Sequence, residues 1–300
     1  MTARTFRIHR PPSYFPGTMI LFNYLSVLVF WREILMKKLP QFLLLILLLL
    51  FACQTVPVTG RRQLSLIPSG TLLPMSFTSY TDFLSRHKVI ENTPQARMVK
   101  NVGTKIQHAV ERYMARQNMS DRLKGYKWEF HLVEDKEMNA WCMPGGKVVV
   151  YSGILPVTRD DTGLAVVLGH EVAHAVANHG DERMSQGLLA QMGGMALSAA
   201  LAEKPKETQD LFMAAFGLGS QVGVLLPYSR LQESEADHLG LIFMAMAGYD
   251  PRAAVDFWKR MSSAQHAGAQ PEFLSTHPAD ATRIRNIEEL IPEAMKYYKP

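Results

Sequence analysis

The sequence predicts an α+β fold that is mainly helical, with a small sheet beside one buried helix. Apolar side chains recur at helical spacing along 161–176, where few positions are polar. Residues 128–133 alternate between apolar and polar side chains, and 147–151 form a β-branched run after the Pro-Gly-Gly turn at 144–146. These patterns indicate two short strands that lie against a helical core.

Residues 36–52 have the layout of a bacterial lipoprotein signal peptide. Two lysines follow Met36, an apolar run spans 42–52, and Leu50 to Cys53 resembles a lipobox. The run is too short to cross a bilayer, which takes about 20 residues. We therefore expect a mature chain that begins at a lipid-modified Cys53, with residues 1–35 an upstream extension that is not made. A genuine N-terminal extension is the alternative.

This expectation places the mature protein in the bacterial cell envelope, anchored in the membrane by lipid and facing the periplasm. By analogy with enterobacterial lipoprotein sorting, Gln54 after the cysteine, rather than Asp, favours the outer membrane. Residues 53–70 contain two prolines and two glycines and are expected to serve as lipid anchor and tether. Residues 71–300 are expected to form one domain.

Most of the excess positive charge lies in the expected leader. The chain has a net charge of +5, but residues 1–52 hold six basic residues and one acidic residue, which leaves 26 of each sign in 53–300. This balance, without a basic stripe, argues against nucleic acid as a partner. With Cys53 lipidated, Cys142 has no intrachain partner, so neither a disulfide framework nor a cysteine zinc site is expected.

Two helices, 78–91 and 94–117, are expected before the strands, because apolar residues recur there at helical spacing. Residues 184–226 are rich in Met, Gly, Ala and Leu and are expected to form two helical stretches, with a break at Lys204-Pro205-Lys206. Their role stays open between a loosely packed core hairpin, an adaptable surface and a lid over a neighbouring site.

The buried helix carries the motif His170-Glu171-Val172-Ala173-His174. His170 and His174 lie one turn apart on one face, so both imidazoles can reach one metal ion. Glu171 is placed to take a proton from a water molecule at that metal. Two solvated histidines on a surface helix are the alternative, but a buried helix favours the metal because buried polar groups need partners.

A third metal ligand is expected from the segment 228–237. The spacing that places a third histidine six residues after the motif fails here, since Gly180 stands at that position. Glu233 and Asp237 are four residues apart, so Glu233 can bind the metal while Asp237 accepts the outer N–H of His170. Glu235 is the competing candidate, and a solvated acidic helix face is the alternative for the whole segment.

The ordered set of motifs resembles peptidase family M48, in its Oma1-like branch of soluble or lipid-anchored members. The matching stretches are the HExxH motif, Glu233 to Asp237 in an E-x-E-A-D pattern, the strand segment 139–151, Ser275-Thr276-His277-Pro278 with Arg283, and the stretch 57–64. The resemblance implies a zincin-like (gluzincin) metallopeptidase fold with one Zn²⁺ per chain. It implies His170, His174 and Glu233 as ligands and endopeptidase activity.

The resulting hypothesis is a zinc-dependent endopeptidase of the bacterial envelope that degrades misfolded or misassembled proteins, with Glu171 as general base. His277 and Arg283 are candidate donors to the oxyanion. His277 can instead be a fourth metal ligand that keeps the enzyme latent. The strand Lys147, Val148, Val149 and Val150 is expected to offer an edge to an extended polypeptide. A zinc-containing lipoprotein that acts as chaperone or assembly scaffold without proteolysis is the alternative.

Overall fold

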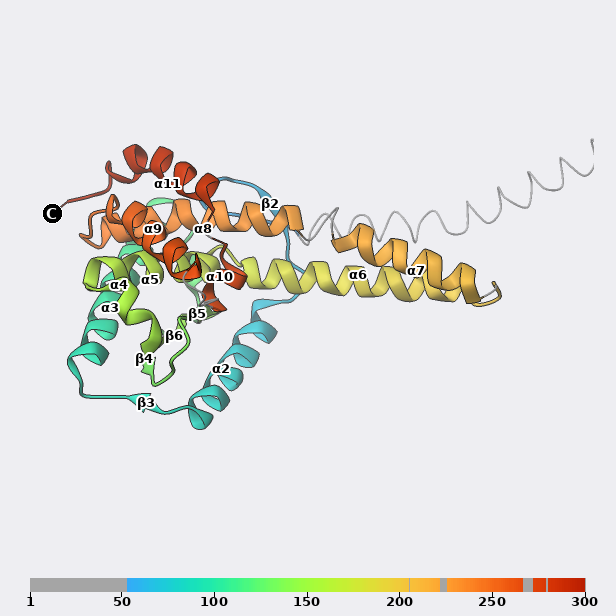
Figure 1. Ribbon diagram of the computed structural model, residues 1–300, viewed down its shortest axis with the longest axis horizontal. Coiled ribbons are helices and arrows are strands. Elements are labelled where there is room, and N and C mark those ends of the chain that lie inside the picture. Colours follow the sequence, from blue (N-terminus) through green and yellow to red (C-terminus); the bar gives the residue numbers. More distant parts are fainter. Residues whose placement is uncertain (1–52, 205, 222–225, 267–271, 279, 300) are drawn as a thin grey trace, which may run out of the picture. The chain divides into compact units, whose positions relative to one another are not determined.

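The computed structural model describes residues 53–300 apart from 205, 222–225, 267–271, 279 and 300, and these form one compact unit. Helices dominate and the sheets are small, so the predicted fold class is confirmed (Figure 1). The expected signal peptide at 36–52 and the upstream extension at 1–35 lie outside the described residues.

The helices surround α5, which carries the HExxH motif. Every residue of α5 from Gly163 to Val176 is buried, and the helix packs against α3, α8, α9 and the strand β5. A helix that is apolar on all sides needs neighbours on all sides. The larger helices are α2 Ser69–Arg86, α3 Pro94–Arg116, α5 Asp161–Val176, α6 His179–Leu201, α7 Lys206–Ser220, α8 Leu226–Met246, α9 Ala253–His266 and α11 Ala281–Ala294.

Short helical segments complete the connections: η1 Ser120–Leu123, η2 Ser152–Ile154, α4 Leu155–Thr158 and α10 Glu272–Thr276. The expected helix 94–117 corresponds to α3. The expected helix 78–91 is wrong at both ends, because α2 begins at Ser69 and ends at Arg86. Pro74 lies inside α2 and lacks an amide hydrogen, which in a sequence indicates a helix break. The first turns of α2 were therefore not predicted. Residues after Arg86 leave the helix to pair with the sheet.

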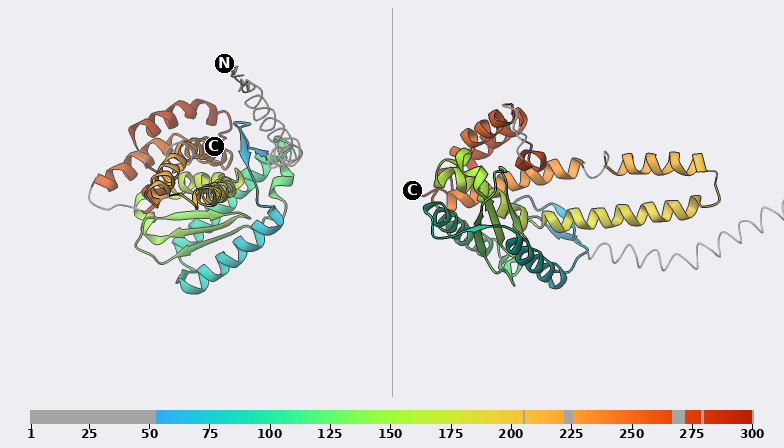
Figure 2. Two further views of the ribbon diagram at one scale, coloured as in Figure 1. Left: turned by 90° about the vertical axis from the view of Figure 1, so that its right-hand side faces the viewer. Right: turned by 60° about the horizontal axis from the view of Figure 1, so that its bottom comes forward.

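The main sheet has the strand order β3-β4-β6-β5 and lies beside α3 and α5 (Figure 2). Its strands are β3 Val89–Ile90, β4 Glu129–Val133, β5 Ala140–Met143 and β6 Lys147–Tyr151. The pair β4–β6 is parallel and the other two pairs are antiparallel. The strands predicted at 128–133 and 147–151 are β4 and β6. The sequence interpretation missed β3 and β5, which are short and do not alternate.

The position of β6 corrects one expectation. Val148 pairs with Phe130 of β4 on one side and with Cys142 of β5 on the other, and all five residues of β6 are buried. Lys147, Val148, Val149 and Val150 therefore offer no free edge to a substrate, because both edges already have partners. The edge of the sheet on this side is β5.

The segment expected to be a tether is folded onto the domain. Strands β1 Cys53–Thr55 and β2 Arg62–Leu64 form an antiparallel ribbon, and Val56 in the turn between them is fully buried. The Gln63 side-chain amide donates to the carbonyl oxygen of Ala177 at the end of α5 (2.7 Å). Residues 53–64 are thus packed against the domain, and the role of 53–70 as lipid anchor and tether stays a prediction.

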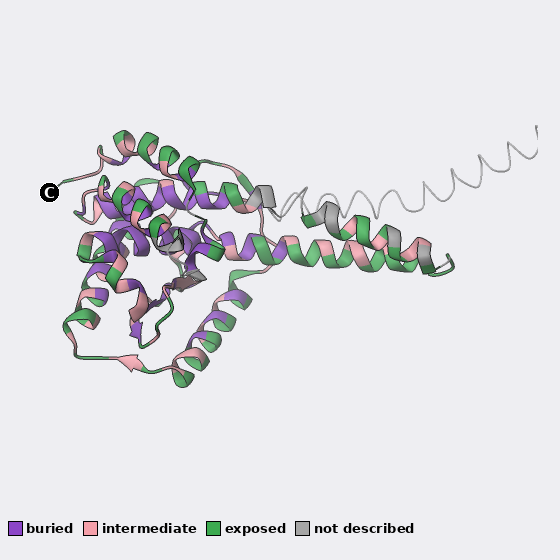
Figure 3. Ribbon diagram, viewed as in Figure 1, coloured by how far each residue is buried: buried purple, intermediate pink, exposed green. Residues whose placement is uncertain are grey.

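Helices α6 and α7 pair with each other and project from the rest of the domain (Figure 3). They do not form the loosely packed core hairpin that was one expectation, because much of their apolar surface is exposed. Among the described helices, none is long and apolar enough to cross a membrane. Among the residues of this hairpin whose burial is described, the exposed large apolar side chains are Met184, Leu188, Leu189, Met192, Met195 and Phe212.

Two glycines allow α5 and α8 to approach closely beside the motif. A Cβ atom at Gly240 would lie 2.9 Å from the backbone nitrogen of His170, and a Cβ atom at Gly169 would lie 2.8 Å from the carbonyl oxygen of Gly240. Real Cβ contacts are longer than this. The helix backbones therefore touch directly, which places the side chains of α8 next to those of α5.

We expect Gly240→Ala to lower the free energy of unfolding by about 1–3 kcal/mol, because the added methyl group must push the two helix backbones apart. Urea unfolding of the metal-free protein measures this. Gly187→Ala on α6 is the matched control, since a Cβ atom there meets nothing within 4 Å. The control is expected to be neutral or to stabilise by up to about 1 kcal/mol. Equal effects of both changes would contradict the close backbone contact.

Candidate metal centre

Helices α5 and α8 bring His170, His174 and Glu233 together in the core. The Nε2 atoms of His170 and His174 lie 3.1 Å apart. Glu233 places Oε1 at 3.2 Å from His174 Nε2 and Oε2 at 3.4 Å from His170 Nε2. The three residues are buried, so the two histidines are not the solvated pair that was the alternative for this motif.

His277, directly after α10, joins this group. Its Nδ1 lies 2.9 Å from Glu233 Oε2 and 3.2 Å from His170 Nε2. One ligand atom from each of His170, His174, Glu233 and His277 lies within 4.8 Å of the others. The four groups thus converge on one point from α5, α8 and the segment after α10.

The chemistry of this donor set fits a metal ion. Three imidazole nitrogens and a carboxylate oxygen are ligands that zinc accepts at a four-coordinate site. Without a metal, the three imidazoles must share protons around Glu233, and their hydrogen bonds outweigh the burial that raises its pKa, so the pKa of Glu233 is strongly lowered. A cation at this point would take the place of those protons. These four buried donors therefore form a candidate metal centre.

His170 has partners on both ring nitrogens. Its Nδ1 lies 3.0 Å from Oδ1 of Asp237, the residue expected to accept its outer N–H. Burial lowers the pKa of His170, but the hydrogen bonds to Asp237 and Glu233 outweigh burial and raise it to about 9 in the metal-free chain. A metal must displace this proton, so its affinity falls as the pH falls.

Arg283 lies behind the ligands rather than in front of them. Its Nε and Nη2 donate to the two carboxylate oxygens of Asp237 (both 2.8 Å), and its Nη1 lies 3.2 Å from Glu233 Oε2. The guanidinium stacks on Trp258, with 3.7 Å to the ring centroid. Arg283 is buried and does not line the hollow that Glu171 faces. This placement corrects the expectation of an oxyanion donor, because a group held there orients Asp237 and Glu233.

Glu171 faces a hollow of about 520 Å³ that we call the β5 hollow. Its Oε1 is buried and has no hydrogen-bond partner among the described residues, and it lies 3.5 Å from Nε2 of His277. Burial raises the pKa of Glu171. A carboxylate with a free buried oxygen beside a candidate metal is suited to accept a proton. The hollow is lined by Asn139, Ala140, Trp141, Cys142, Glu171, His174, Arg183, Ser229, Ser275, Thr276 and His277.

His179, which the sequence interpretation missed, and Glu235, which it gave as the competing candidate for third ligand, support His174 from behind. Nδ1 of His174 lies 2.9 Å from Nδ1 of His179, and Nε2 of His179 lies 3.2 Å from Oε2 of Glu235. Glu235 therefore points to His179 and away from the cluster. Burial raises the pKa of Glu235, but hydrogen bonds from His179, Arg61 and Thr59 outweigh it and lower the pKa to about 2. The signal in the sequence was a third histidine five residues after the motif, but helix spacing does not predict the contact, because α5 ends at Val176 and His179 begins α6.

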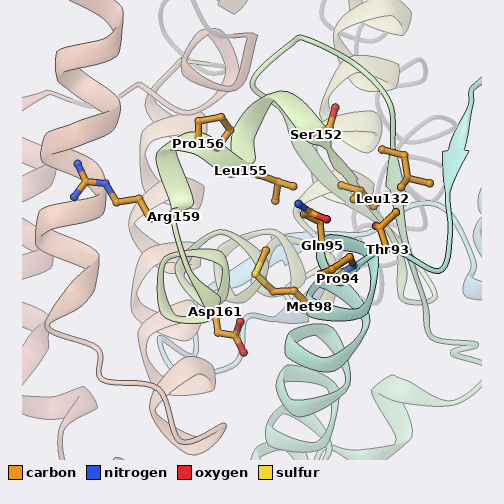
Figure 4. A pocket seen from close by; sticks show the side chains of 11 residues that line it. Thr93, Pro94, Gln95, Met98, Leu132, Ser152, Leu155, Pro156, Arg159 and Asp161 are labelled. Atoms are coloured by element: carbon orange, nitrogen blue, oxygen red, sulfur yellow. The ribbon is translucent and has the colours of Figure 1, made fainter.

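A larger hollow, of about 790 Å³, lies away from the cluster (Figure 4). It is bounded by the start of α3, by α4 and by the start of α5. Gln95, Met98 and Leu155 point towards one another across it, whereas the guanidinium of Arg159 points away. Its lining includes none of the four cluster residues. Size alone would select this hollow, but Glu171, His174 and His277 line the β5 hollow instead.

Residues 101–291 match the model of peptidase family M48. The chain belongs to this family. The family resemblance seen in the motifs is thereby confirmed, and with it the zincin-like fold. The match includes both helices that hold the cluster, the edge strand β5 and the segment with His277 and Arg283. Members of M48 are metal-dependent peptidases.

The chain is similar to several curated members and relatives of the family. It is 36% identical over 243 residues to the mitochondrial metalloendopeptidase OMA1 of Schizosaccharomyces pombe, covering 80% of this chain and 66% of that protein. It is 33% identical over 213 residues to the Saccharomyces cerevisiae OMA1, covering 69% and 59%. It is 31% identical over 164 residues to the putative beta-barrel assembly-enhancing protease of Vibrio cholerae, covering 53% and 34%. The chain thus spans about a third to two-thirds of these relatives.

We expect Arg283→Gln to lower the free energy of unfolding of the metal-free M48 domain by about 3–5 kcal/mol. The change leaves the buried carboxylates of Asp237 and Glu233 without their guanidinium partner. Urea unfolding at neutral pH measures the loss. Arg285→Gln, two residues further along and exposed, is the matched control and is expected to stay within about 0.5 kcal/mol of the parent. A loss of similar size in both variants would contradict the assigned role.

Proposed function

We propose that this M48 protein is a zinc-dependent endopeptidase with His170, His174 and Glu233 as metal ligands and Glu171 as general base. One observation carries the proposal: Glu171 and His174 face the same hollow, next to the edge strand β5. The proton acceptor Glu171 and the candidate metal centre thus lie next to the strand edge that would bind an extended polypeptide. Because the protein covers only part of its relatives, its activity is inferred from this arrangement rather than from their names.

The mechanism assigns one task to each group. Zinc, when bound, supplies a Lewis acid that polarises a carbonyl group and makes water more acidic. Glu171 accepts the proton of the attacking water on the oxygen that lacks a partner and returns it to the leaving amine. Burial raises the pKa of Glu171 in the metal-free chain, which makes its carboxylate a better proton acceptor. Asp237 orients His170 through its outer nitrogen, and Arg283 holds Asp237 in place.

The substrate is a polypeptide bound in extended form along β5. An unpaired strand edge offers backbone hydrogen bonds to any chain, which gives affinity with little sequence preference. Such loose preference suits the degradation of misfolded or misassembled proteins of the bacterial cell envelope. A lipid on Cys53 would hold the domain at a membrane on the periplasmic side, with the outer membrane favoured by Gln54. The relative named as a putative beta-barrel assembly-enhancing protease supports an envelope setting, whereas the OMA1 relatives are mitochondrial.

Casein digestion with zinc analysis tests the proposal. We expect Glu171→Gln to retain about one zinc per chain and to lose on the order of 10²- to 10⁴-fold in turnover, because only the proton acceptor is removed. Glu233→Gln is expected to lose both zinc and activity, since a ligand is removed. If Glu171→Gln digested casein as fast as the parent, the proposed mechanism would be wrong.

The alternative function is a zinc-containing chaperone or assembly scaffold without proteolysis. It is favoured by His277, which lies close enough to the other three residues to complete a closed four-ligand site. The enzyme is favoured by Glu171, whose free oxygen a scaffold does not need. Suppression of casein aggregation by the parent and Glu171→Gln alike, without any cleavage, would select the scaffold.

We further propose that His277 is an inhibitory fourth ligand. Its Nδ1 lies within the cluster, in contact with Glu233 and His170, rather than on the far side of the hollow where an oxyanion donor is needed. Four protein ligands leave no open position for water, so the resting enzyme is latent.

We expect His277→Ala to raise basal casein digestion or self-cleavage while zinc stays bound. An oxyanion donor would show the opposite sign, a loss on the order of 10²-fold in turnover. Rates of the parent and the variant, with zinc content measured in both, distinguish the two roles. His108→Ala, on the exposed surface of α3 and outside the cluster, is a matched control.

The lipid anchor is tested by mass spectrometry of the protein isolated from its own membranes. We expect the mature N-terminus to be Cys53 with two or more acyl chains, because a single chain anchors a protein only marginally. Cys53→Ser is expected to release the protein from the membrane fraction. Detection of peptides from residues 1–35 in the mature protein would refute the expected cleavage.

A further inference from the structure

The N-terminal ribbon reaches the candidate metal centre through a chain of side chains. Arg61 contacts Glu235, Glu235 contacts His179, and His179 contacts His174 (2.9–3.2 Å along the chain). His174 in turn places Nε2 next to Glu233 and His170. Arg61 lies 113 positions before His174 in the sequence. It is thus linked to His174 through the side chains of Glu235 and His179.

When His174 binds a metal, the two hydrogen bonds that join His174 to His179 and His179 to Glu235 must both run towards Glu235. Metal binding through Nε2 requires the proton of neutral His174 to lie on Nδ1. That N–H donates to Nδ1 of His179, so the proton of His179 must lie on Nε2, where it faces the carboxylate of Glu235. If Glu235 did not receive this proton, His179 could carry it on Nδ1 and reverse the tautomer of His174.

Arg61 fixes Glu235 in the orientation that this chain requires. Its Nε and Nη2 donate to the two oxygens of Glu235 (3.0 and 2.9 Å), and Nη1 and Nη2 donate to Glu182 (2.7 and 2.8 Å). Thr59 donates to Glu235 Oε1 (2.7 Å). Glu182 and Glu235 are 1% and 2% exposed, so this guanidinium neutralises two buried carboxylates from α6 and α8. The planar fork matches both carboxylates in a way that a lysine ammonium does not.

We propose that Arg61 is a positioning residue for the metal centre: it holds Glu235 against Nε2 of His179 and thereby keeps Nε2 of His174 free for the metal. The proposal rests on the proposed function, in which His174 is a ligand. It assigns a task to the N-terminal ribbon, which is the part of the domain that follows directly on Cys53. His179 and Glu235 become outer supports of His174, as Asp237 and Arg283 are of His170.

The test is zinc affinity, measured on the full chain by competition with a chromophoric chelator at neutral pH. We expect Arg61→Gln to weaken zinc binding on the order of 10-fold, the usual effect of losing a group that orients a ligating histidine. Arg62→Gln is the matched control, because Arg62 is the next residue, carries the same charge and is exposed. Its affinity is expected to equal that of the parent.

Two further measurements separate positioning from general support of the fold. Glu235→Gln should weaken zinc binding to a similar extent, and the double variant Arg61→Gln/Glu235→Gln should bind no more weakly than either single variant, because both act through one chain. The visible absorption spectrum of the cobalt-substituted protein should change in Arg61→Gln and stay unchanged in Arg62→Gln. A purely structural residue would lower the unfolding midpoint and leave both affinity and spectrum as in the parent.

The outcomes distinguish this inference from the proposed function. If the parent binds no zinc, the proposed function fails. If the parent binds zinc and Arg61→Gln binds it equally well, only the role of Arg61 fails. Should Arg61→Gln not fold, Arg61→Lys retains the charge without the fork, and its affinity is expected to lie between those of Arg61→Gln and the parent. Affinity equal to the parent in a folded Arg61→Lys would overturn the proposal.

Discussion

The fold depends on the burial of carboxylates between α5 and α8. Glu171, Glu233, Glu235 and Asp237 are each at most 8% exposed, and a buried charge is costly unless it is paired. Two guanidinium groups balance them from opposite ends of the chain: Arg61 pairs with Glu235 and Arg283 pairs with Asp237. Glu233 lies between these pairs, with three histidines around it and only Nη1 of Arg283 near one of its oxygens (3.2 Å). Two acidic residues of α8 are thus each held by both oxygens to an arginine, whereas Glu233 is held mainly by the histidines of the candidate metal centre.

This division explains the spacing of the E-x-E-A-D segment. Residues 233 and 237 lie on one face of α8 and residue 235 lies on another, so the three side chains reach different partners. Glu233 meets both histidines of the motif, Asp237 meets the outer nitrogen of His170, and Glu235 meets His179. Each histidine of α5 therefore has an acidic support on its outer side, one direct and one through a second imidazole. Because the helix backbones approach closely at Gly169 and Gly240, the acidic side chains of α8 can reach the histidines of α5.

The sequence predicted the parts of the structure that local patterns determine. Helix periodicity identified α3 and α5, and alternation identified β4. The β-branched run after the Pro-Gly-Gly turn identified β6, and the four-residue spacing of Glu233 and Asp237 identified the face that meets His170. What it could not predict was set by contacts between distant segments. The edge position of β5 depends on which strands flank β6, and the ribbon over 53–64 depends on Glu182 and Glu235, more than 100 residues away. Arg283 was recognised as a site residue, but its position relative to the metal ligands was not predicted. That position is set by its contacts with Trp258 and Asp237.

Side-chain hydrogen bonds join α8 to the start of α6 at the base of the α6–α7 hairpin. Gln232 of α8 donates to Oε2 of Glu182 near the start of α6 (2.7 Å), and Arg183 donates to Gln232 Oε1 (3.4 Å). Two residues 50 positions apart are thereby tied side by side, and the metal ligands lie outside the loop that this tie closes. The hairpin is in this sense an interchangeable insert. A shorter connection between Glu182 and Gln232 would join the helices that carry the metal ligands at the same two points.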